Sequence, residues 1–435
     1  MTGAPFAIRG ALASLSPADR RRLFGRETSS DEAVRARTAT LVARVRRDGD
    51  SALRELALEF DGVAVHHLEV PRSAWREALD ALDPSLRRAL ERARDNIRAV
   101  HESFRPVAQQ VTTRDGAVVG RRPDPLGRVG VYAPGGRATY PSSLLMGVVP
   151  ARVAGVSEVV VCSPPGPSGR PSPVLLAAAE LAGADRVFSA GGAGAIAAMA
   201  FGTATIPRVD RIVGPGNAWV AEAKLQVAGA CAIDSPAGPS ELLILADGGA
   251  DPEVLAHEMI AQAEHDPRAA VVLVATDGDL LTRVEHAAGR LVSTQARAGV
   301  VREAFAGRGA LLLASSMDEA LAFASDYAPE HALVCCADEE AIASRLRSAG
   351  TIFIGASSSV AFGDYLTGAN HVLPTGGLAR SYSGLSTADF YRWTTWQRID
   401  RATAASLAAD VGVLADAEGL PGHAAAARRW KETAR

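Results

Sequence analysis

Apolar side chains recur every three to four residues in two long segments near the N-terminus, residues 31–62 and 71–104. This spacing is typical of amphipathic helices, and the first segment ends at Asp61-Gly62, a common helix stop. Charges of both signs occupy the positions between the apolar ones. We therefore predict helices that expose their polar faces and pack by their apolar faces against another part of the protein.

From residue 118 to 235 the pattern changes to short β-branched runs that alternate with alanine-rich stretches. The predicted strands are 127–136, 156–165 and 184–192, and the predicted helices are 173–183 and 193–202. The order of strand, tight turn, helix and strand is typical of a parallel sheet in an α/β protein.

A second set of the same kind runs from residue 240 to 356. Its predicted strands are 240–249, 269–277, 309–316, 331–336 and 350–356. Two parallel sheets, each covered by helices, make two similar α/β halves the predicted architecture. After residue 385 the pattern returns to helices and ends in an alanine-rich C-terminus.

The composition adds few constraints. The 435 residues are 48% apolar and 22% charged, which is ordinary for a globular chain of two or more domains. The net charge of −3 provides no large cationic field, so neither nucleic acid nor an anionic membrane surface is an expected partner. No segment reaches the ~18 apolar residues of a membrane span, and the N-terminus lacks the pattern of a secretion signal.

Cysteine use indicates the compartment. The four cysteines are Cys162, Cys231, Cys335 and Cys336, three of them in apolar, strand-like runs, and none forms C-x-x-C. Buried, reduced thiols in a cytoplasmic protein are the prediction.

One glycine-rich turn is a candidate cofactor site. Residues 191–198 fit G-x-G-x-x-A through Gly192, Gly194 and Ala197, and Asp210 follows 18 residues after the first of them. Dinucleotide-binding units place such a turn between a strand and a helix, with an acidic residue further on. The alternative is that small residues let an alanine-rich helix pack closely on a sheet.

A second turn, residues 213–220, places two glycines and Asn217 before another predicted helix. Its backbone N–H groups could meet a phosphate, or Asn217 could hydrogen-bond a ribose or an amide. A helix N-cap is the structural alternative for this asparagine.

Polar residues on the predicted helix 251–267 are candidate metal ligands. Gln262 and His265 are three positions apart and would share a helix face, with Glu258 one turn earlier. Surface or core histidines are the common alternative.

Two further segments concentrate polar residues around glycine and proline. Residues 362–375 carry Asp364 and His371 in a glycine-rich loop, and Glu418 and His423 flank a Pro-Gly turn near the C-terminus. A set of Gln, His, Asp and His donors suits Zn²⁺ or a similar ion.

Glu330 and His331 are adjacent where a polar run gives way to an apolar one. Neighbouring side chains on a strand point to opposite faces, so the two can serve one site only if the backbone bends at the strand start. A polar strand start is the alternative without function.

Eight segments in order carry a resemblance over roughly residues 28–423. They are GVYAPGGRATYPSSLLM, VGPGNAWVAEAK, IDSPAGPSE, AQAEHDP, APEH, GDYLTGANHVLPT, SGLS and EGLPGH. Together they resemble the histidinol dehydrogenase family, which oxidises L-histidinol through L-histidinal to L-histidine at the end of histidine biosynthesis while reducing two NAD⁺.

The resemblance implies an α/β fold with two Rossmann-like parallel-sheet domains, small helical segments and an intertwined homodimer with shared active sites. The implied boundaries are a first domain of 28–131 and 240–385, a cofactor-side domain of 132–239, a small helical domain of 1–27 and 386–409, and a C-terminal arm of 410–435 that reaches the partner's active site.

The resemblance also implies residue roles. The zinc ligands, one ion per subunit, fall on Gln262, His265, Asp364 and His423. The acid–base pair falls on Glu330 and His331. Substrate contacts fall on the same six residues and on Ser240, His371 and Glu418. NAD contacts match at Tyr132 and Asn217, and Gly194 stands where the family usually has glutamine.

For the implied chemistry we expect His331 to take the alcohol proton and Glu330 to activate water for the second oxidation. Zinc is expected to orient the substrate through its imidazole and amino groups. The alternatives are a paralogue that acts on another hydroxylated substrate such as a sulfonated diol, with Gly194 as its support, a catalytically inactive zinc-stabilised dimer, and a single-step NAD alcohol dehydrogenase.

Overall fold

The computed structural model describes residues 6–26, 31–135 and 139–432. The chain divides into two compact units, the first formed by Met1–Phe104 and Gly127–Phe390 and the second by Arg105–Leu126 and Tyr391–Arg435. No helix in the described part of the chain is long and apolar enough to cross a membrane.

The first unit contains a five-stranded parallel sheet. In spatial order its strands are β6 (Arg186–Ser189), β5 (Glu158–Ser163), β4 (Arg128–Tyr132), β7 (Arg211–Val213) and β8 (Ala232–Ile233). Its helices are α6 (Pro141–Ala154), α7 (Pro173–Ala182), α8 (Gly192–Phe201) and α9 (Ala218–Val227). The valines of β4 and β5 are fully buried, as expected where helices cover both faces of a parallel sheet.

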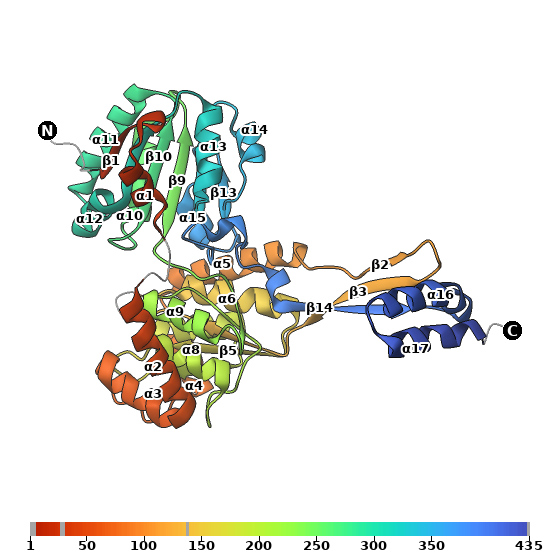
Figure 1. Ribbon diagram of the computed structural model, residues 1–435. Coiled ribbons are helices and arrows are strands. Elements are labelled where there is room, and N and C mark those ends of the chain that lie inside the picture. The colour runs from red at the N-terminus through yellow and green to blue at the C-terminus, as the bar shows by residue number, and fades with distance from the viewer. Residues whose placement is uncertain (1–5, 27–30, 136–138, 433–435) are drawn as a thin grey trace. The chain divides into compact units, whose positions relative to one another are not determined.

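A six-stranded parallel sheet forms the other half of the first unit (Figure 1). In spatial order its strands are β1 (Ile8–Ala11), β11 (Gly309–Leu313), β10 (Ala270–Ala275), β9 (Glu241–Ala246), β12 (His331–Cys335) and β13 (Thr351–Ile354). Its helices are α1 (Pro17–Phe24), α10 (Pro252–Ala263), α11 (Gly278–Val292), α12 (Ala298–Arg308), α13 (Met317–Tyr327), α14 (Glu339–Arg345) and α15 (Val360–Tyr365).

Apart from β1, both sheets have the same doubly wound order, with the first strand in the middle and the order reversing beside it. The prediction of two similar α/β halves is confirmed. The reversal lies between β4 and β7 in one sheet and between β9 and β12 in the other.

The predicted domain boundaries are wrong in two places. Helices α2 (Glu32–Asp48), α3 (Asp50–Leu56), α4 (Arg72–Asp80) and α5 (Pro84–Ser103) pack on α6 to α9 of the five-stranded sheet, instead of joining the half that contains 240–385. The apolar face of α2 and α3 shares one core with α8, in which Val45 and Leu53 are buried. Helical periodicity predicts such a face but cannot identify the sheet that it meets.

Segments 1–27 and 386–409 do not form the predicted small helical domain. Residues Ile8–Ala11 form strand β1 and pair in parallel with β11. Residues Tyr391–Arg398 form strand β14, which pairs with β3 in the second unit. Residues 27–30, where the predicted first domain began, lie outside the described part of the chain.

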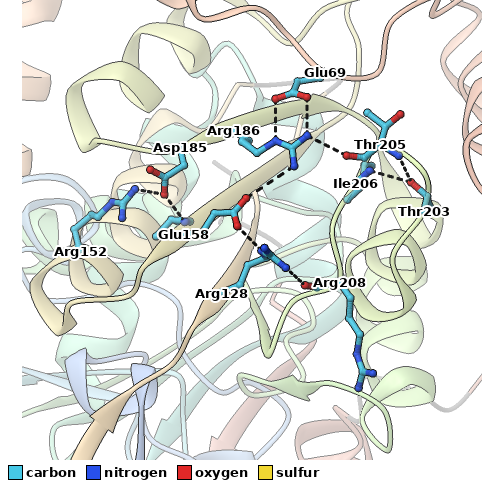
Figure 2. A network of polar contacts seen from close by, with 11 residues as sticks. Glu69, Arg128, Arg152, Glu158, Asp185, Arg186, Thr203, Thr205, Ile206 and Arg208 are labelled. Carbon is cyan, nitrogen blue, oxygen red and sulfur yellow. Dashed lines mark hydrogen bonds and ion pairs between the residues drawn. The ribbon is translucent and has the colours of Figure 1, made fainter.

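A polar network ties the amino ends of β4, β5 and β6 together (Figure 2). Arg186 makes two bonds to Glu69, of 2.9 and 2.7 Å, and lies 3.9 Å from Glu158, which also pairs with Arg128. Exposed ion pairs contribute little singly, but a connected set fixes neighbouring strands. We assign the network a structural role, because the cofactor candidate Tyr132 lies at the opposite end of β4.

The second unit holds a three-stranded antiparallel sheet of β14, β3 (Val118–Pro125) and β2 (Gln109–Thr112). Gly120 lies opposite Trp396, and a Cβ there would come 2.4 Å from the indole, so the ring packs directly on the backbone. Helices α16 (Arg401–Ala417) and α17 (Pro421–Glu432) pack side by side (Figure 1).

Candidate active site

The backbone bends where Glu330 and His331 lie. Helix α13 ends at Tyr327, Ala328 adopts a left-handed conformation with φ of 51°, and β12 begins at His331. Both side chains contact the same residue of the neighbouring strand, Glu241. The predicted bend at the strand start is confirmed, and it lets two adjacent residues face one place.

The contacts with Glu241 fix both side chains. Its backbone N–H donates to Glu330 Oε2 at 2.7 Å, and its carbonyl oxygen lies 2.9 Å from His331 Nδ1. A carbonyl oxygen only accepts, so Nδ1 carries the proton and donates. When the imidazole is neutral, its free lone pair is therefore on Nε2.

His331 Nε2 is buried and has no hydrogen-bond partner among the described residues. Its nearest charged neighbour is Asp364, whose Oδ1 lies 3.8 Å away. A small cavity is lined here by His331, Asp364 and His371 together with Thr351, Phe353, Gly363, Ala369, Asn370 and Leu373. Buried polar atoms are rarely unpaired, so this nitrogen indicates a place for a ligand.

Opposing effects set the pKa of His331. Burial lowers it by disfavouring the charged ring, but the carboxylate of Glu330, 3.4 Å from Nδ1, and that of Asp364 raise it to about 9. Both carboxylates therefore favour the protonated ring, so the neutral form that can act as a base prevails only above about pH 9.

The loop after α15 holds His371 beside Asp364. His371 Nδ1 donates to the backbone oxygen of Asp364 at 2.7 Å, and its Nε2 accepts from the hydroxyl of Ser143 on α6 at 3.0 Å. Burial lowers its pKa, which keeps the ring neutral. His371 lies in the cluster with Asp364, and both of its nitrogens are engaged inside the chain.

The other predicted ligands of the first unit lie at the end of α10 and before β9. Gln262 is buried in the last turn of α10, and its side-chain amide makes no hydrogen bond with the residues described. His265 lies beyond the helix end and is exposed, because Pro267 ends the helix earlier than its periodicity indicates. Ser240 immediately precedes Glu241.

Glu258 has a different role from the one suggested by its place near Gln262. Its Oε2 accepts the backbone N–H of Val360 at 3.0 Å, at the start of α15. Since α15 carries Asp364, this contact joins the two helices that hold predicted zinc ligands, and α10 packs against α15.

The donors present in the first unit fit an incomplete zinc set. Gln262 is buried, His265 is exposed and Asp364 borders the cavity. No three His, Cys, Asp or Glu side chains gather as a metal set within residues 6–26, 31–135 and 139–432. Zinc usually takes four ligands, so these three donors would leave one ligand position unfilled.

Glu418 and His423 belong to the second unit. Glu418 directly follows the end of α16 and His423 lies in the first turn of α17, and both are exposed. The Pro-Gly turn of the sequence is thus the start of the last helix.

The predicted cofactor residues flank the reversal of strand order in the five-stranded sheet. Tyr132 ends β4, and Asn217 follows β7. Ligands of open α/β sheets bind at the carboxyl ends of strands beside such a reversal. Glu330 and His331 lie instead at the amino end of their sheet.

Both residues also support the local backbone. The Tyr132 hydroxyl accepts the Gly192 N–H at 3.1 Å, at the start of α8, and burial raises its pKa to about 12. Asn217 Oδ1 accepts the backbone N–H groups of Trp219 and Val220 at 3.1 and 3.2 Å. The N-cap interpretation of Asn217 is therefore confirmed, and its exposed position leaves the amide N–H₂ toward solvent.

Gly194 and Asp210 do not complete a dinucleotide fingerprint. A Cβ at Gly194 would come 2.9 Å from Leu56 and 3.4 Å from Leu53, so this glycine permits α8 to pack against α3. Asp210 accepts the backbone N–H of Arg128 at 2.9 Å, at the amino end of β4. The glycine at position 194 is thus explained by close helix packing, and it does not indicate a different substrate.

Sequence reasoning missed a buried ion pair beside the second glycine turn. Lys224 of α9 pairs with Asp234, with side chains 2% and 4% exposed, and Asp234 Oδ2 accepts the Gly214 N–H at 2.7 Å. The pair anchors the turn that leads to Asn217. Its only signal in the sequence is a lysine in a chain whose other basic residues are almost all arginine.

Comparison with known proteins identifies the family. The histidinol dehydrogenase family model matches residues 24–430. Histidinol dehydrogenase of Haloarcula marismortui is 47% identical over 96% of this chain and 98% of its own length, and that of Natronomonas pharaonis is 49% identical over 95% and 97%. The crystal structure of histidinol dehydrogenase from Elizabethkingia anophelis has a TM-score of 0.94 at 31% identity, covering 100% of this chain and 99% of that one. The chain therefore belongs to the histidinol dehydrogenase family of NAD-dependent oxidoreductases.

Proposed function

We propose that Glu330 and His331 divide the two proton transfers of the family reaction between them. The reaction is the NAD-dependent four-electron oxidation of L-histidinol through L-histidinal to L-histidine, the last step of histidine biosynthesis. The observation that carries the assignment is His331 Nε2, a buried nitrogen that faces the cavity without a partner among the described residues.

In the first oxidation His331 accepts the hydroxyl proton of the alcohol at Nε2. Its Nδ1–H is committed to the Glu241 carbonyl, so the lone pair of the neutral ring faces the cavity. Glu330 and Asp364 stabilise the imidazolium that forms. Tyr132 and Asn217 would contact NAD⁺, which would supply the hydride acceptor for each of the two oxidations.

In the second oxidation Glu330 accepts a proton from water as the water oxygen adds to the aldehyde carbon. Its Oε2 is held by the Glu241 N–H, whereas Oε1 makes no hydrogen bond to the part of the chain described. The His331 imidazolium returns its proton to the carbonyl oxygen, and the hydrate that results has the hydroxyl and the hydrogen that the second oxidation removes. Two adjacent proton acceptors thus serve one carbon in turn.

Zinc would be held by Gln262, His265, Asp364 and His423, and it would orient the substrate through its imidazole and amino groups. The buried position of Gln262 and the position of Asp364 on the cavity support this set. Ser240, His371 and Glu418 complete the proposed substrate contacts.

We propose a homodimer in which the second unit of one copy supplies His423 and Glu418 to the other copy. The second unit exposes large apolar side chains, among them Val107, Val111, Val413 and Leu414, each more than 60% exposed. Such surfaces favour burial against another chain. A cytoplasmic location is supported by the four free cysteines.

Two single-residue variants test the assignment. His331→Asn should lose the first oxidation by about 10²- to 10⁴-fold, the range of general acid–base catalysis. Glu330→Gln should keep the oxidation of L-histidinol to the aldehyde but lose the oxidation of supplied L-histidinal. Equal losses in both half-reactions for both variants would contradict the division of roles.

A further inference from the structure

A second buried carboxylate lies against Glu330. Glu241, the first residue of β9, has a side chain 2% exposed, and its Oε2 accepts the Glu330 N–H at 3.4 Å. Its own N–H donates to Glu330 Oε2 at 2.7 Å, and its Oε1 accepts the Gly376 N–H at 2.8 Å. The two glutamates are thus joined in both directions between neighbouring strands.

Arg26, just after α1, is the cation that faces this pair. Its guanidinium forms an ion pair with Glu241 Oε2, and its side chain is also 2% exposed. It donates to the backbone oxygen of Tyr327, and its central carbon lies 3.5 Å from the centre of the Tyr327 ring. The planar cation is therefore fixed on three sides.

Two carboxylates buried side by side cannot both remain ionised without a compensating charge. Burial raises the pKa of Glu241 and so does Glu330, whereas Arg26 lowers it. Without the arginine, Glu241 would no longer be held as the carboxylate that accepts the Glu330 N–H.

We propose that Arg26 is a positioning residue for the second oxidation, which acts through the Glu241 side chain to hold Glu330 in place. This inference rests on the proposed role of Glu330. The Glu241 side chain contacts Glu330, whereas His331 is held by the Glu241 backbone carbonyl, so the loss of Arg26 affects aldehyde oxidation selectively.

The test uses the zinc-loaded, full-length enzyme and measures oxidation of L-histidinol and of supplied L-histidinal separately. Arg26→Met should lower kcat for the aldehyde about 100-fold or more, with KM little changed and with alcohol oxidation within about tenfold of the parent. In Arg26→Met/Glu241→Gln the surplus negative charge is gone, so kcat for the aldehyde should return to within about tenfold of the parent. Arg22→Met is the matched control, since Arg22 lies in the same segment but bonds to the carbonyls of Ala306 and Gly307.

Two results would overturn the inference: parental aldehyde oxidation in folded Arg26→Met, or no recovery in the folded double variant. If Arg26→Met does not fold, Arg26→Lys decides, because it keeps the charge and should retain aldehyde oxidation within about tenfold. A folded Arg26→Lys that loses 100-fold would also overturn it. Undiminished aldehyde oxidation in Glu330→Gln would instead refute the proposed role of Glu330, so the two failures are distinguishable.

Discussion

Lys224→Met should destabilise the first unit strongly. Lys224 is one of two lysines among the 46 Lys and Arg residues, and it is almost fully buried. Its ammonium pairs with Asp234 and donates to the carbonyl oxygens of Gly214 and Ser235 at 3.1 and 3.4 Å. Methionine keeps the apolar stem but leaves a buried carboxylate and two carbonyls without their donor.

Removing one partner of a buried ion pair costs about 3–5 kcal/mol. Asp234 can avoid part of this cost by taking up a proton, since burial already raises its pKa. A carboxyl group whose folded-state pKa is raised contributes stability at low pH and loses it as the pH rises through that pKa. The free energy of unfolding of the variant should therefore be lower than that of the parent by about 3 kcal/mol at pH 7, and by less at pH 5.

Guanidinium denaturation followed by circular dichroism measures this difference, with Lys431→Met on the exposed face of α17 as the matched control. We also expect a higher KM for NAD⁺, because the pair anchors the turn before Asn217. A variant within about 0.5 kcal/mol of the parent, like the control, would refute the reasoning.

Three other predictions follow from single contacts. Burial lowers the pKa of His101 to about 4, and its Nδ1 bonds to Thr387 at 3.1 Å. The folded state therefore loses stability as the pH falls from 6.5 toward 4, and His101→Asn should flatten this acid limb in denaturation curves; an unchanged limb would contradict the assignment. Gly194→Gln should destabilise by about 1–3 kcal/mol through contact with Leu56 and leave KM for NAD⁺ nearly unchanged, whereas a clear fall in KM would favour the cofactor role. By NMR titration of zinc-free protein, the pKa of His331 should be near 9 and should fall in Glu330→Gln; equal values would mean that Glu330 does not set it.

The sequence predicted the helices and strands better than it predicted which of them pack together. The valine-rich strands and the alanine-rich helices can be recognised from the spacing of apolar residues along the chain. Both parallel sheets form as expected. Helices α2 to α5 were recognised by the same periodicity, yet their apolar faces would suit either sheet. Strand β1 has only four residues, too few for a pattern to separate it from the helices nearby.

In the candidate site, too, the sequence predicted local features but not contacts between distant segments. The bend at Glu330-His331 follows from two reactive neighbours at a strand start, and Ala328 provides it. The contact of Arg26 with Glu241 joins residues 215 positions apart, so no local pattern could predict it. Asp210 has the spacing of a ribose ligand, but the direction of β4 places it at the amino end of the sheet.

The stoichiometry of the reaction tests the central claim most directly. Purified protein is incubated with limiting L-histidinol and excess NAD⁺, and the NADH formed per substrate consumed is counted. The account predicts two NADH with L-histidine as the product, because one site serves both oxidations. One NADH with release of the aldehyde would contradict the role of Glu330 in a second step, and no turnover in zinc-containing protein would contradict L-histidinol as the substrate.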